Sequence, residues 1–239
     1  MLMEGVIRAK LIERIRRTPT VESFRFLPET KASFLPGQFT RLFFDTADKN
    51  NAGVNKYLSF SCAPGHDYIE VTKRLSDSEF SQRLKSLQKG DEVGLSRPLG
   101  NCIFKDDYKK IVFLTGGIGI TPAISIIEYI IGKNIDTDIV LLYANRNEDE
   151  IAFKLELDAW QKNSKKLKIC YTVSCKSSPD SVCREGNIDA VFCRGNLVDL
   201  CERKVFIYGP PAMVAAMQDL ALQLDCKKEN VLIENFTGY

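Results

Sequence analysis

The sequence has few of the residues and patterns that mark metal-binding proteins or disulfide-bonded secreted proteins. Its 239 residues include a single histidine, His66, and none of its eight cysteines forms a Cys-x-x-Cys pair. We therefore expect no metal site. Cysteines at these scattered positions are typical of reduced thiols that pack as small apolar residues in a cytoplasmic protein.

Long apolar runs and a strong excess of one charge are also missing. No run approaches the ~18–20 apolar residues of a membrane-spanning helix, and residues 1–5 lack the charged and apolar regions of a signal peptide. The net charge is only +2, which argues against nucleic acid as the main partner. With 44% hydrophobic and 27% charged residues, the chain is expected to be a globular cytoplasmic protein without a membrane span.

The hydrophobic pattern changes near a charged connector at residues 105–110, which predicts two domains, 1–104 and 108–239. Up to residue 104, short alternating segments separated by proline and glycine turns predict an antiparallel β-barrel, closed on itself. Its expected strands are 6–12, 21–26, 38–44, 57–61, 68–73 and 91–95, with one helix at 80–87.

Beyond the connector, short apolar runs alternate with helical segments, which predicts an α/β domain with a doubly wound parallel sheet. The expected strands are 111–114, 139–143, 167–173, 205–208 and 231–233, and the clearest helices are 121–131, 149–162 and 211–224. Ligands of such sheets bind at the carboxyl ends of the strands. The turns that follow these strands are therefore the first place to look for a site.

The most informative turn is the glycine-rich segment 115–122, between the first of these strands and a helix. Thr121 is expected to be the helix N-cap and Pro122 its first residue. Glycines allow a diphosphate to approach the backbone, and a helix N-terminus offers free N–H groups and positive dipole charge. The alternative is an ordinary tight turn of an α/β domain.

Three further segments could hold a cofactor. The strand at 56–64 combines a cation with hydroxyl residues, and the turn at 208–213 contains Gly209, Pro210 and Pro211 before a helix. The chain ends with two aromatic residues, Phe236 and Tyr239. Taken singly, these segments are also explained by a barrel strand with its turn, by a capped helix start, and by a tail pinned to the core.

Together and in this order, the segments resemble the ferredoxin–NADP reductase superfamily over essentially the full chain. Lys56-Tyr57-Leu58-Ser59 is similar to that family's flavin motif Arg-x-Tyr-Ser. The turn at 116–122 is similar to its pyridine-nucleotide turn, and residues 208–213 to its Cys-Gly-Pro-Pro-x-Met. Gln38 lies in a match to the family's Pro-Gly-Gln-Phe segment.

The resemblance implies FAD in the barrel and a nicotinamide nucleotide, NADPH or NADH, on the α/β domain. The flavin contacts it implies are Lys56, Tyr57, Leu58, Ser59, Ser61, Thr72, Lys73, Ser81 and Phe236. The nucleotide contacts it implies are Thr115, Gly116, Gly117, Gly119, Thr121, Pro122, Arg146, Ser174, Lys176, Tyr208, Gly209, Pro210, Pro211 and Met213. Ser59, Glu234 and Tyr239 are the candidate catalytic residues, with a terminal aromatic covering the flavin and Glu234 either relaying a proton or anchoring the tail.

The chain departs from the family pattern at three positions. Lys56 replaces an arginine, Leu58 replaces the aromatic residue that lies against the flavin, and Tyr208 replaces a cysteine. The Leu58 departure leaves Tyr57 or another residue to cover that ring face. The sequence also lacks the Cys-x4-Cys-x2-Cys run of the iron–sulfur domain that some relatives carry.

These observations predict an FAD-dependent oxidoreductase that takes hydride from NAD(P)H and passes electrons onward. NADPH is favoured because Arg146, Ser174 and Lys176 follow the expected strands and no carboxylate follows 139–143 directly. These charges could equally be solvated loop residues. An acidic ferredoxin or flavodoxin is a possible acceptor, docking on basic residues near the first strand: Arg8, Lys10, Arg14, Arg16 and Arg17.

Two other functions remain open. The same fold could serve as a non-catalytic electron-transfer or regulatory subunit of a larger redox complex, since fold alone does not fix activity. The chain could also be a nucleotide-binding module without flavin, because of the substitutions at Lys56 and Leu58.

Overall fold

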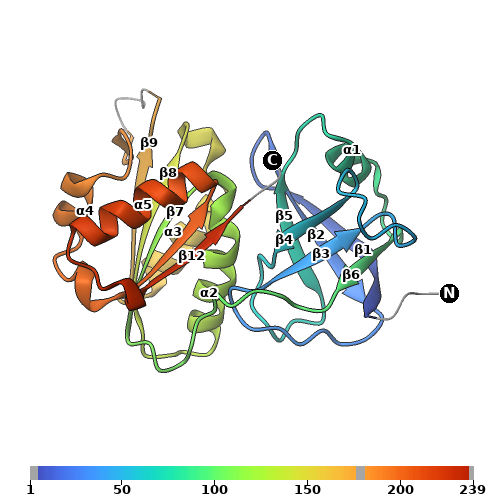
Figure 1. The fold of residues 1–239 in the computed structure, drawn as a ribbon, viewed down its shortest axis with the longest axis horizontal. Helices are drawn as coiled ribbons and strands as arrows, with labels where there is room; N and C mark the ends of the chain where they lie inside the picture. Colours follow the sequence, from blue (N-terminus) through green and yellow to red (C-terminus); the bar gives the residue numbers. More distant parts are fainter. Residues whose placement is uncertain (1–4, 176–180, 237–239) are drawn as a thin grey trace. The chain divides into compact units, whose positions relative to one another are not determined.

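A computed structural model describes residues 5–175 and 181–236. Within it the chain divides into two compact units. One comprises Met1–Ile103 with Thr121–Tyr129, and the other Phe104–Ile120 with Ile130–Tyr239. The ribbon is shown in Figure 1, and each unit is described separately below.

The first unit is a six-stranded antiparallel sheet in the order β4-β3-β6-β1-β2-β5. Its elements are β1 (Val6–Arg16), β2 (Val21–Pro28), β3 (Phe39–Phe43), β4 (Asn55–Ser59), β5 (Ile69–Arg74), α1 (Glu79–Ser86) and β6 (Glu92–Ser96). Alternate residues of these strands point inward, and the core they form includes Phe24, Phe26 and Leu42. The predicted strands and helix of this half are therefore all present.

The sheet is barrel-like but not closed, which corrects the prediction of a closed barrel. β4 and β5 are its two edges. They are linked by one isolated bridge, Phe60 with Val71, and by the hydrogen bond from Ser61 N to Glu70 O (2.9 Å). A short strand-by-strand pattern cannot reveal this opening, because closure depends on whether the first and last strands of the sheet meet over their full length.

The second unit is a six-stranded parallel sheet in the order β10-β9-β8-β7-β11-β12. Its strands are β7 (Lys110–Gly116), β8 (Asp138–Asn145), β9 (Leu167–Val173), β10 (Arg184–Glu185), β11 (Lys204–Gly209) and β12 (Val231–Asn235). From β7 the chain moves outward to β10, and then crosses back to β11 on the other side of β7. The order therefore reverses between β7 and β11, which is where open α/β sheets bind ligands.

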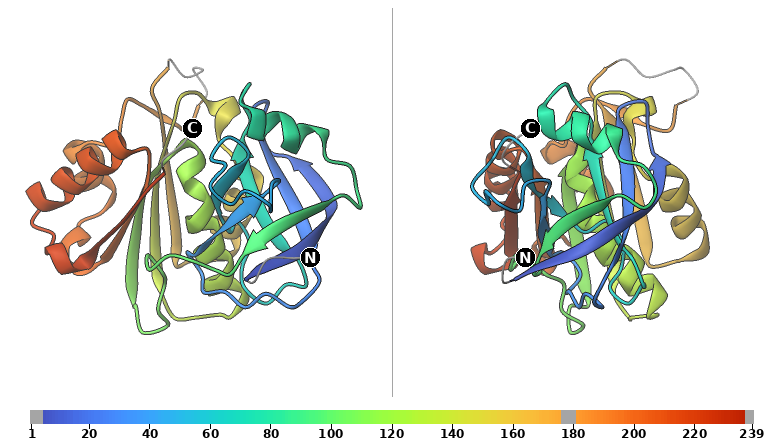
Figure 2. Two further views of the ribbon diagram at one scale, coloured as in Figure 1. Left: turned by 45° about the vertical axis from the view of Figure 1, so that its right-hand side comes forward. Right: turned by 90° about the vertical axis from the view of Figure 1, so that its right-hand side faces the viewer.

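Helices and short 3₁₀ turns connect these strands. They are η1 (Gly117–Gly119), α2 (Ile120–Gly132), η2 (Glu148–Glu150), α3 (Lys154–Asn163), α4 (Ala190–Asn196), η3 (Leu200–Glu202), α5 (Pro211–Gln223) and η4 (Lys228–Asn230). Figure 2 shows α4 and α5, in orange and red, together on one side of the parallel sheet. There Phe192 and Val214 pack on strand residues such as Leu114 and Ile207.

Two helix predictions are wrong, and one short helix was not predicted. Thr121 is not an N-cap, because the 3₁₀ turn η1 runs directly into α2 and the preceding cap is Gly116. α3 begins at Lys154 rather than 149, because Phe153 adopts a left-handed backbone (φ 61°) that interrupts the helix. The short α4 was not predicted, since seven residues give too few turns for a periodic pattern.

All eight cysteines lie within the described segments, and none forms a disulfide. Across residues 5–175 and 181–236, no helix combines the length and the apolar character that a membrane span requires. Nor do three His, Cys, Asp or Glu side chains of these segments gather where they could hold a metal ion.

Candidate functional site

In the antiparallel unit, the predicted flavin residues gather on the two edge strands. Lys56, Tyr57 and Ser59 belong to β4, while Thr72 and Lys73 belong to β5. Edge strands present backbone N–H and C=O groups that are not used in a ladder and can bond a ligand. The fold thus brings together, at one opening of the sheet, two segments that are about a dozen residues apart in sequence.

Positive charge is concentrated at this opening. Lys73 lies on β5, is only 8% exposed, and has a lowered pKa. Burial is the main cause, and repulsion from Lys56 and Arg74 adds to it. A ligand carrying negative charge would relieve this repulsion, so the donor set fits a diphosphate.

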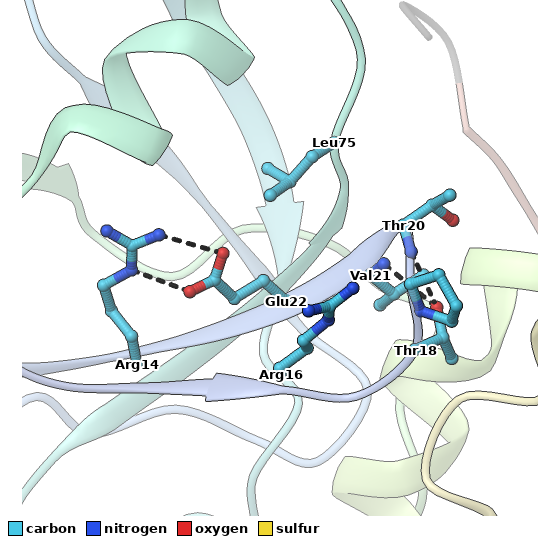
Figure 3. A pocket seen from close by; sticks show the side chains of 8 residues that line it. Arg14, Arg16, Thr18, Thr20, Val21, Glu22 and Leu75 are labelled. Atoms are coloured by element: carbon cyan, nitrogen blue, oxygen red, sulfur yellow. Dashed lines mark hydrogen bonds and ion pairs between the residues drawn. The ribbon is translucent and has the colours of Figure 1, made fainter.

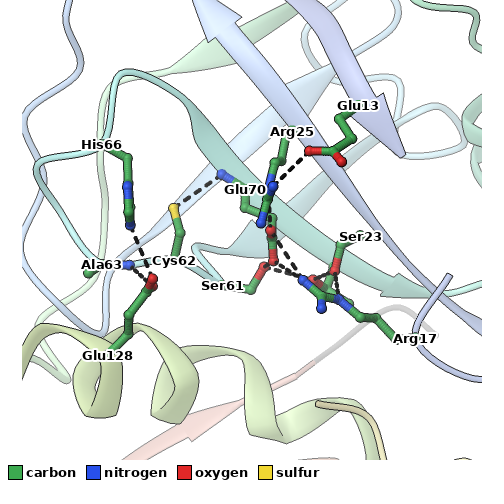
Figure 4. A network of polar contacts seen from close by, with 11 residues as sticks. Glu13, Arg17, Ser23, Arg25, Ser61, Cys62, Ala63, His66, Glu70 and Glu128 are labelled. Atoms are coloured by element: carbon green, nitrogen blue, oxygen red, sulfur yellow. Dashed lines mark hydrogen bonds and ion pairs between the residues drawn. The ribbon is translucent and has the colours of Figure 1, made fainter. Parts of the chain in front are cut away.

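Ser61 and Thr72 belong to a buried polar network instead of projecting freely (Figure 4). Their hydroxyl groups lie 2.7 Å apart, and Ser61 Oγ also donates to Glu70 Oε1 (3.1 Å). Thr72 Oγ1 bonds in turn to Ser23 Oγ (2.6 Å). Both side chains are at most 3% exposed, so they act mainly by holding the ends of the edge strands in place.

Glu70 is the centre of that network, and the sequence did not identify it. Its carboxylate accepts hydrogen bonds from Arg25 Nε (2.8 Å) and Arg17 Nη2 (3.1 Å) while being only 2% exposed. Burial lowers the pKa of Arg25, but its bonds to Glu70 outweigh this and raise the pKa above its usual value. A glutamate inside an alternating strand gives no sequence signal of such pairing, because its partners lie 45 and 53 residues away.

The side chains of Tyr57 and Leu58 point to opposite faces of β4, which decides which of them can contact a ligand. Leu58 is 7% exposed and packs in the barrel core, whereas Tyr57 is 59% exposed. Ser59 lies two residues after Tyr57 and therefore on the same face of the strand. Tyr57, rather than Leu58, is the residue of this motif that offers a ring to a ligand.

Ser81 lies in the first turn of α1, which follows β5. Ser78 is the N-cap and accepts a hydrogen bond from Ser81 N. The hydroxyl groups of Ser76 and Ser78 lie 3.2 and 3.1 Å from Ser81 Oγ. Ser81 is fully buried, and its N–H and hydroxyl are both bonded to neighbouring serines, so it shapes the start of α1.

In the parallel unit, strand register brings the predicted nucleotide residues together. Thr115 on β7 pairs with Tyr208 on β11, and Tyr208 pairs with Glu234 on β12. Gly116 and Gly209 end β7 and β11. These residues come from three separate parts of the chain and lie side by side at the carboxyl edge of one sheet.

Space is tight at two of these positions, and at Gly119 it requires glycine because the close atom belongs to the backbone. A Cβ atom on Gly116 would lie 2.6 Å from Met213 Sδ, and one on Gly119 would overlap the Tyr208 carbonyl oxygen. Met213 also lies against Gly209, so its side chain packs on both turns. Gly117 has a φ of 52°, which favours glycine for its backbone conformation. The turn therefore exposes backbone where a side chain would block it.

Tyr143, on β8, holds this turn through a hydrogen bond and was not identified from the sequence. It is fully buried, and its hydroxyl donates to the Gly117 carbonyl oxygen at 2.9 Å. The buried hydroxyl of Thr115 likewise donates to the Tyr208 carbonyl oxygen at 3.1 Å. Thr121 and Pro122 are buried within α2, so they support the turn and do not line it.

The segments that follow β8 and β9 carry the residues predicted to select the nucleotide. Arg146 is exposed, and Ser174 N donates to the Asn145 carbonyl oxygen (3.0 Å). The side-chain amide of Asn145 is buried, and neither its nitrogen nor its oxygen has a hydrogen-bond partner in the described structure. Lys176 lies outside the described residues.

The C-terminal strand runs beside the Gly-Pro-Pro turn. Phe236 N donates to the Gly209 carbonyl oxygen (2.9 Å), which places this residue next to the turn. Pro210 and Pro211 are exposed, with Pro210 as the cap and Pro211 as the first residue of α5. Burial raises the pKa of the Glu234 carboxyl to about 7. Tyr239 lies outside the described residues.

Comparison with known proteins agrees with this geometry. The oxidoreductase NAD-binding domain family matches residues 113–219. A flavohemoprotein from Bacillus subtilis is 26% identical over 234 residues, covering 95% of this chain and 58% of the relative. NADH-cytochrome b5 reductase 1 from Coccidioides immitis is 28% identical, covering 82% of this chain and 66% of the relative. The chain thus spans about three-fifths of the length of the curated flavohemoproteins it matches.

A solved structure gives the same fold. The ferredoxin NADP+ reductase from Neisseria gonorrhoeae, with bound FAD and NADP, has a TM-score of 0.81 at 20% identity, covering 98% of this chain and 99% of that one. The two sheets and their order along the chain agree with this fold. The predicted resemblance is confirmed: residues 113–219 match the oxidoreductase NAD-binding domain family, and the chain has the two-domain fold of this ferredoxin NADP+ reductase.

Proposed function

We propose that this chain is an FAD-dependent reductase that takes hydride from a nicotinamide nucleotide and passes electrons to an acceptor. The observation that carries the proposal is the glycine turn between β7 and α2, which lies at the reversal point of a parallel sheet and has no room for side chains. In the same chain, the cations Lys56 and Lys73 and the exposed ring of Tyr57 lie on the two edge strands of an antiparallel sheet.

In this proposal Lys56 and Lys73 hold the diphosphate of FAD, and Tyr57 and Ser59 bind its ring. Gly117 and Gly119 admit the nucleotide diphosphate to the backbone at the start of α2. Bound flavin would supply the hydride-accepting chemistry, which the protein assists by orienting the two rings and excluding water. Glu234, with a pKa of about 7, can hold or release a proton at neutral pH.

The central experiment is an anaerobic absorption spectrum of the purified protein, recorded after reconstitution with FAD and again after NADPH or NADH is added. We expect a yellow protein whose flavin bands bleach when the nucleotide is added. A protein that remains colourless after reconstitution would overturn the proposal in favour of a nucleotide-binding module without flavin.

We propose NADPH as the preferred nucleotide. Arg146 is exposed beside Ser174 at the carboxyl edge, and no carboxylate occupies the end of β8 itself. A cation at this position favours a 2′-phosphate. The name of the Coccidioides relative specifies NADH, which favours the opposite choice. Equal or higher catalytic efficiency with NADH would contradict the preference.

An acidic protein acceptor has weaker support in the structure than in the sequence. Four of the five basic residues near β1 form ion pairs with carboxylates of this chain: Arg8–Glu29, Lys10–Glu92, Arg14–Glu22 and Arg17–Glu70. A pocket of about 310 Å³ lies in this region. In Figure 3, Arg14 is paired with Glu22, and Arg16 has no carboxylate partner among the residues drawn. A ferredoxin or flavodoxin would have to compete with these pairs.

Salt dependence tests this acceptor. If an acidic protein docks here, its reduction rate should fall steeply with ionic strength while the rate with a small dye hardly changes. Equal salt responses for the acidic protein and the dye would contradict docking on these basic residues.

A second candidate function is that of a reductase part within a larger redox assembly. It is favoured because this chain matches only 58% of the length of the Bacillus subtilis flavohemoprotein. Turnover of a soluble dye with NAD(P)H by the isolated chain would show an independent enzyme. Flavin reduction without any turnover would favour the dependent role.

A further inference from the structure

Arg41 and Tyr57 form a cross-strand pair on the outer face of β3 and β4. The register places them directly opposite each other, and the guanidinium carbon of Arg41 lies 5.1 Å from the centre of the Tyr57 ring. Phe39 contacts the same ring edge-on, with ring centres 5.7 Å apart. The tyrosine is thus held by two neighbours and remains 59% exposed.

The Arg41 guanidinium is held by aromatic rings rather than by acids. It also lies 5.3 Å from the centre of the Phe43 ring, and its backbone N–H donates to Ser96 Oγ (2.9 Å). No carboxylate of the described residues forms an ion pair with it, and its Nε is buried without a hydrogen-bond partner. A full positive charge therefore lies next to an exposed ring, and no acid of the described residues neutralises it.

We propose that Arg41 is a positioning residue that holds Tyr57 as a stacking platform for the flavin ring and adds a fixed positive charge beside it. This inference rests on the proposed function and extends it to β3, a strand that the sequence motif does not include. One side of the tyrosine is covered by the guanidinium, so a planar ligand takes the open side.

The ring that stacks on Tyr57 is assigned to the isoalloxazine rather than the adenine of FAD. Ser59 lies on the same strand face, two residues away, and its side chain can bond the polar edge of an isoalloxazine. The positive charge of Arg41 favours the reduced, more negatively charged flavin and so raises its reduction potential.

The main test compares Arg41→Met with the unchanged protein, using FAD affinity, flavin fluorescence and midpoint potential. We expect FAD to bind about three- to tenfold more weakly, its bound fluorescence to rise as the stack loosens, and its midpoint potential to fall. Arg41→Lys keeps the charge without the planar stack. It should therefore retain most of the potential while showing the weaker binding and the higher fluorescence.

A matched control and a second variant separate the mechanism from misfolding. Arg8→Met removes one positive charge from β1 of the same sheet, where Arg8 is 48% exposed and paired with Glu29, and should change none of these values. Tyr57→Ala leaves Arg41 intact and should lower FAD affinity by a similar factor. Because Arg41 acts through Tyr57, the double variant should bind FAD no more weakly than Tyr57→Ala alone.

The outcomes are distinct. Additive losses in the double variant, or Arg41→Met values equal to those of the unchanged protein, would overturn the role of Arg41 while leaving the proposed function intact. FMN lacks the adenine ring, so a loss seen with FAD but not with FMN would overturn the isoalloxazine assignment. An unchanged protein that binds neither FAD nor FMN would overturn the proposed function, and this inference with it.

Discussion

The two sheets build their sites from different parts of the polypeptide. At the opening of the antiparallel sheet, the proposed flavin site consists of charged, hydroxyl and aromatic side chains, and a buried carboxylate, Glu70, fixes the strands behind them. At the edge of the parallel sheet, the proposed nucleotide site consists of backbone that the absence of side chains exposes. The first site should therefore be sensitive to loss of a functional group, and the second to gain of a single carbon atom.

The largest effect is expected in the antiparallel sheet from Glu70→Gln. The substitution leaves Arg17, whose side chain is 8% exposed, and Arg25 without their shared carboxylate. Breaking a buried ion pair on one side costs about 3–5 kcal/mol, which urea unfolding would measure. Glu79→Gln is the control, because its ion pair with Arg83 is solvent-exposed and is worth at most about 1 kcal/mol. A loss for Glu70→Gln as small as this control's would contradict the central role of the network.

Gly119→Ala tests the parallel sheet. Its Cβ would overlap the Tyr208 carbonyl oxygen and lie 2.9 Å from Thr115 Oγ1. We expect a stability loss of about 1–3 kcal/mol and nucleotide binding weakened by at least about tenfold, with FAD binding retained. Gly132→Ala has no atom within 4 Å of its Cβ and serves as the control. Unchanged nucleotide affinity, measured by calorimetry, would show that the turn is not the binding site.

Lys56→Glu should weaken the proposed flavin site without affecting the proposed nucleotide site. It places a carboxylate at the opening where Lys73 and Arg74 gather, and in the proposed complex it would repel the FAD diphosphate. FAD affinity should fall by about tenfold or more, while nucleotide affinity is unchanged. Lys89→Glu, at an exposed loop position, is the charge-matched control. Full flavin occupancy of the Lys56 variant after dialysis would show that Lys56 does not bind the diphosphate.

The last effect is limited to one pH window and concerns Glu234 and the pH dependence of stability. Burial raises its pKa from 4.5 to about 7 in the folded protein, so the folded state holds this proton more tightly than the unfolded state. The stability it contributes is present below about pH 4.5 and is lost as the pH rises to about 7. Glu234→Gln should flatten the stability profile in this window by at most about 1.4 kcal/mol per pH unit. Parallel stability profiles for the two proteins between pH 5 and 8 would contradict the raised pKa of Glu234.

The sequence alone determined both sheets and the turns of the proposed nucleotide site. Alternating residues predicted the antiparallel strands, continuous apolar runs predicted the parallel strands, and glycines marked the turn after β7. These signals are local, because strand periodicity and turn chemistry are properties of neighbouring residues. For the same reason the sequence assigned helix boundaries less well, as at Phe153, whose left-handed backbone delays the start of α3.

Only the tertiary structure decided which side chains share a site. It left the barrel open between β4 and β5, placed Lys73 near Lys56, and buried Glu70 between two arginines. It also turned Leu58 into the core and Tyr57 outward against Arg41. Each of these results depends on register and on pairing between distant strands, where a shift of one residue exchanges the two faces of a strand. A single sequence gives the alternation of side chains along a strand. The neighbouring strands determine which of its two faces is buried and which is open to a ligand.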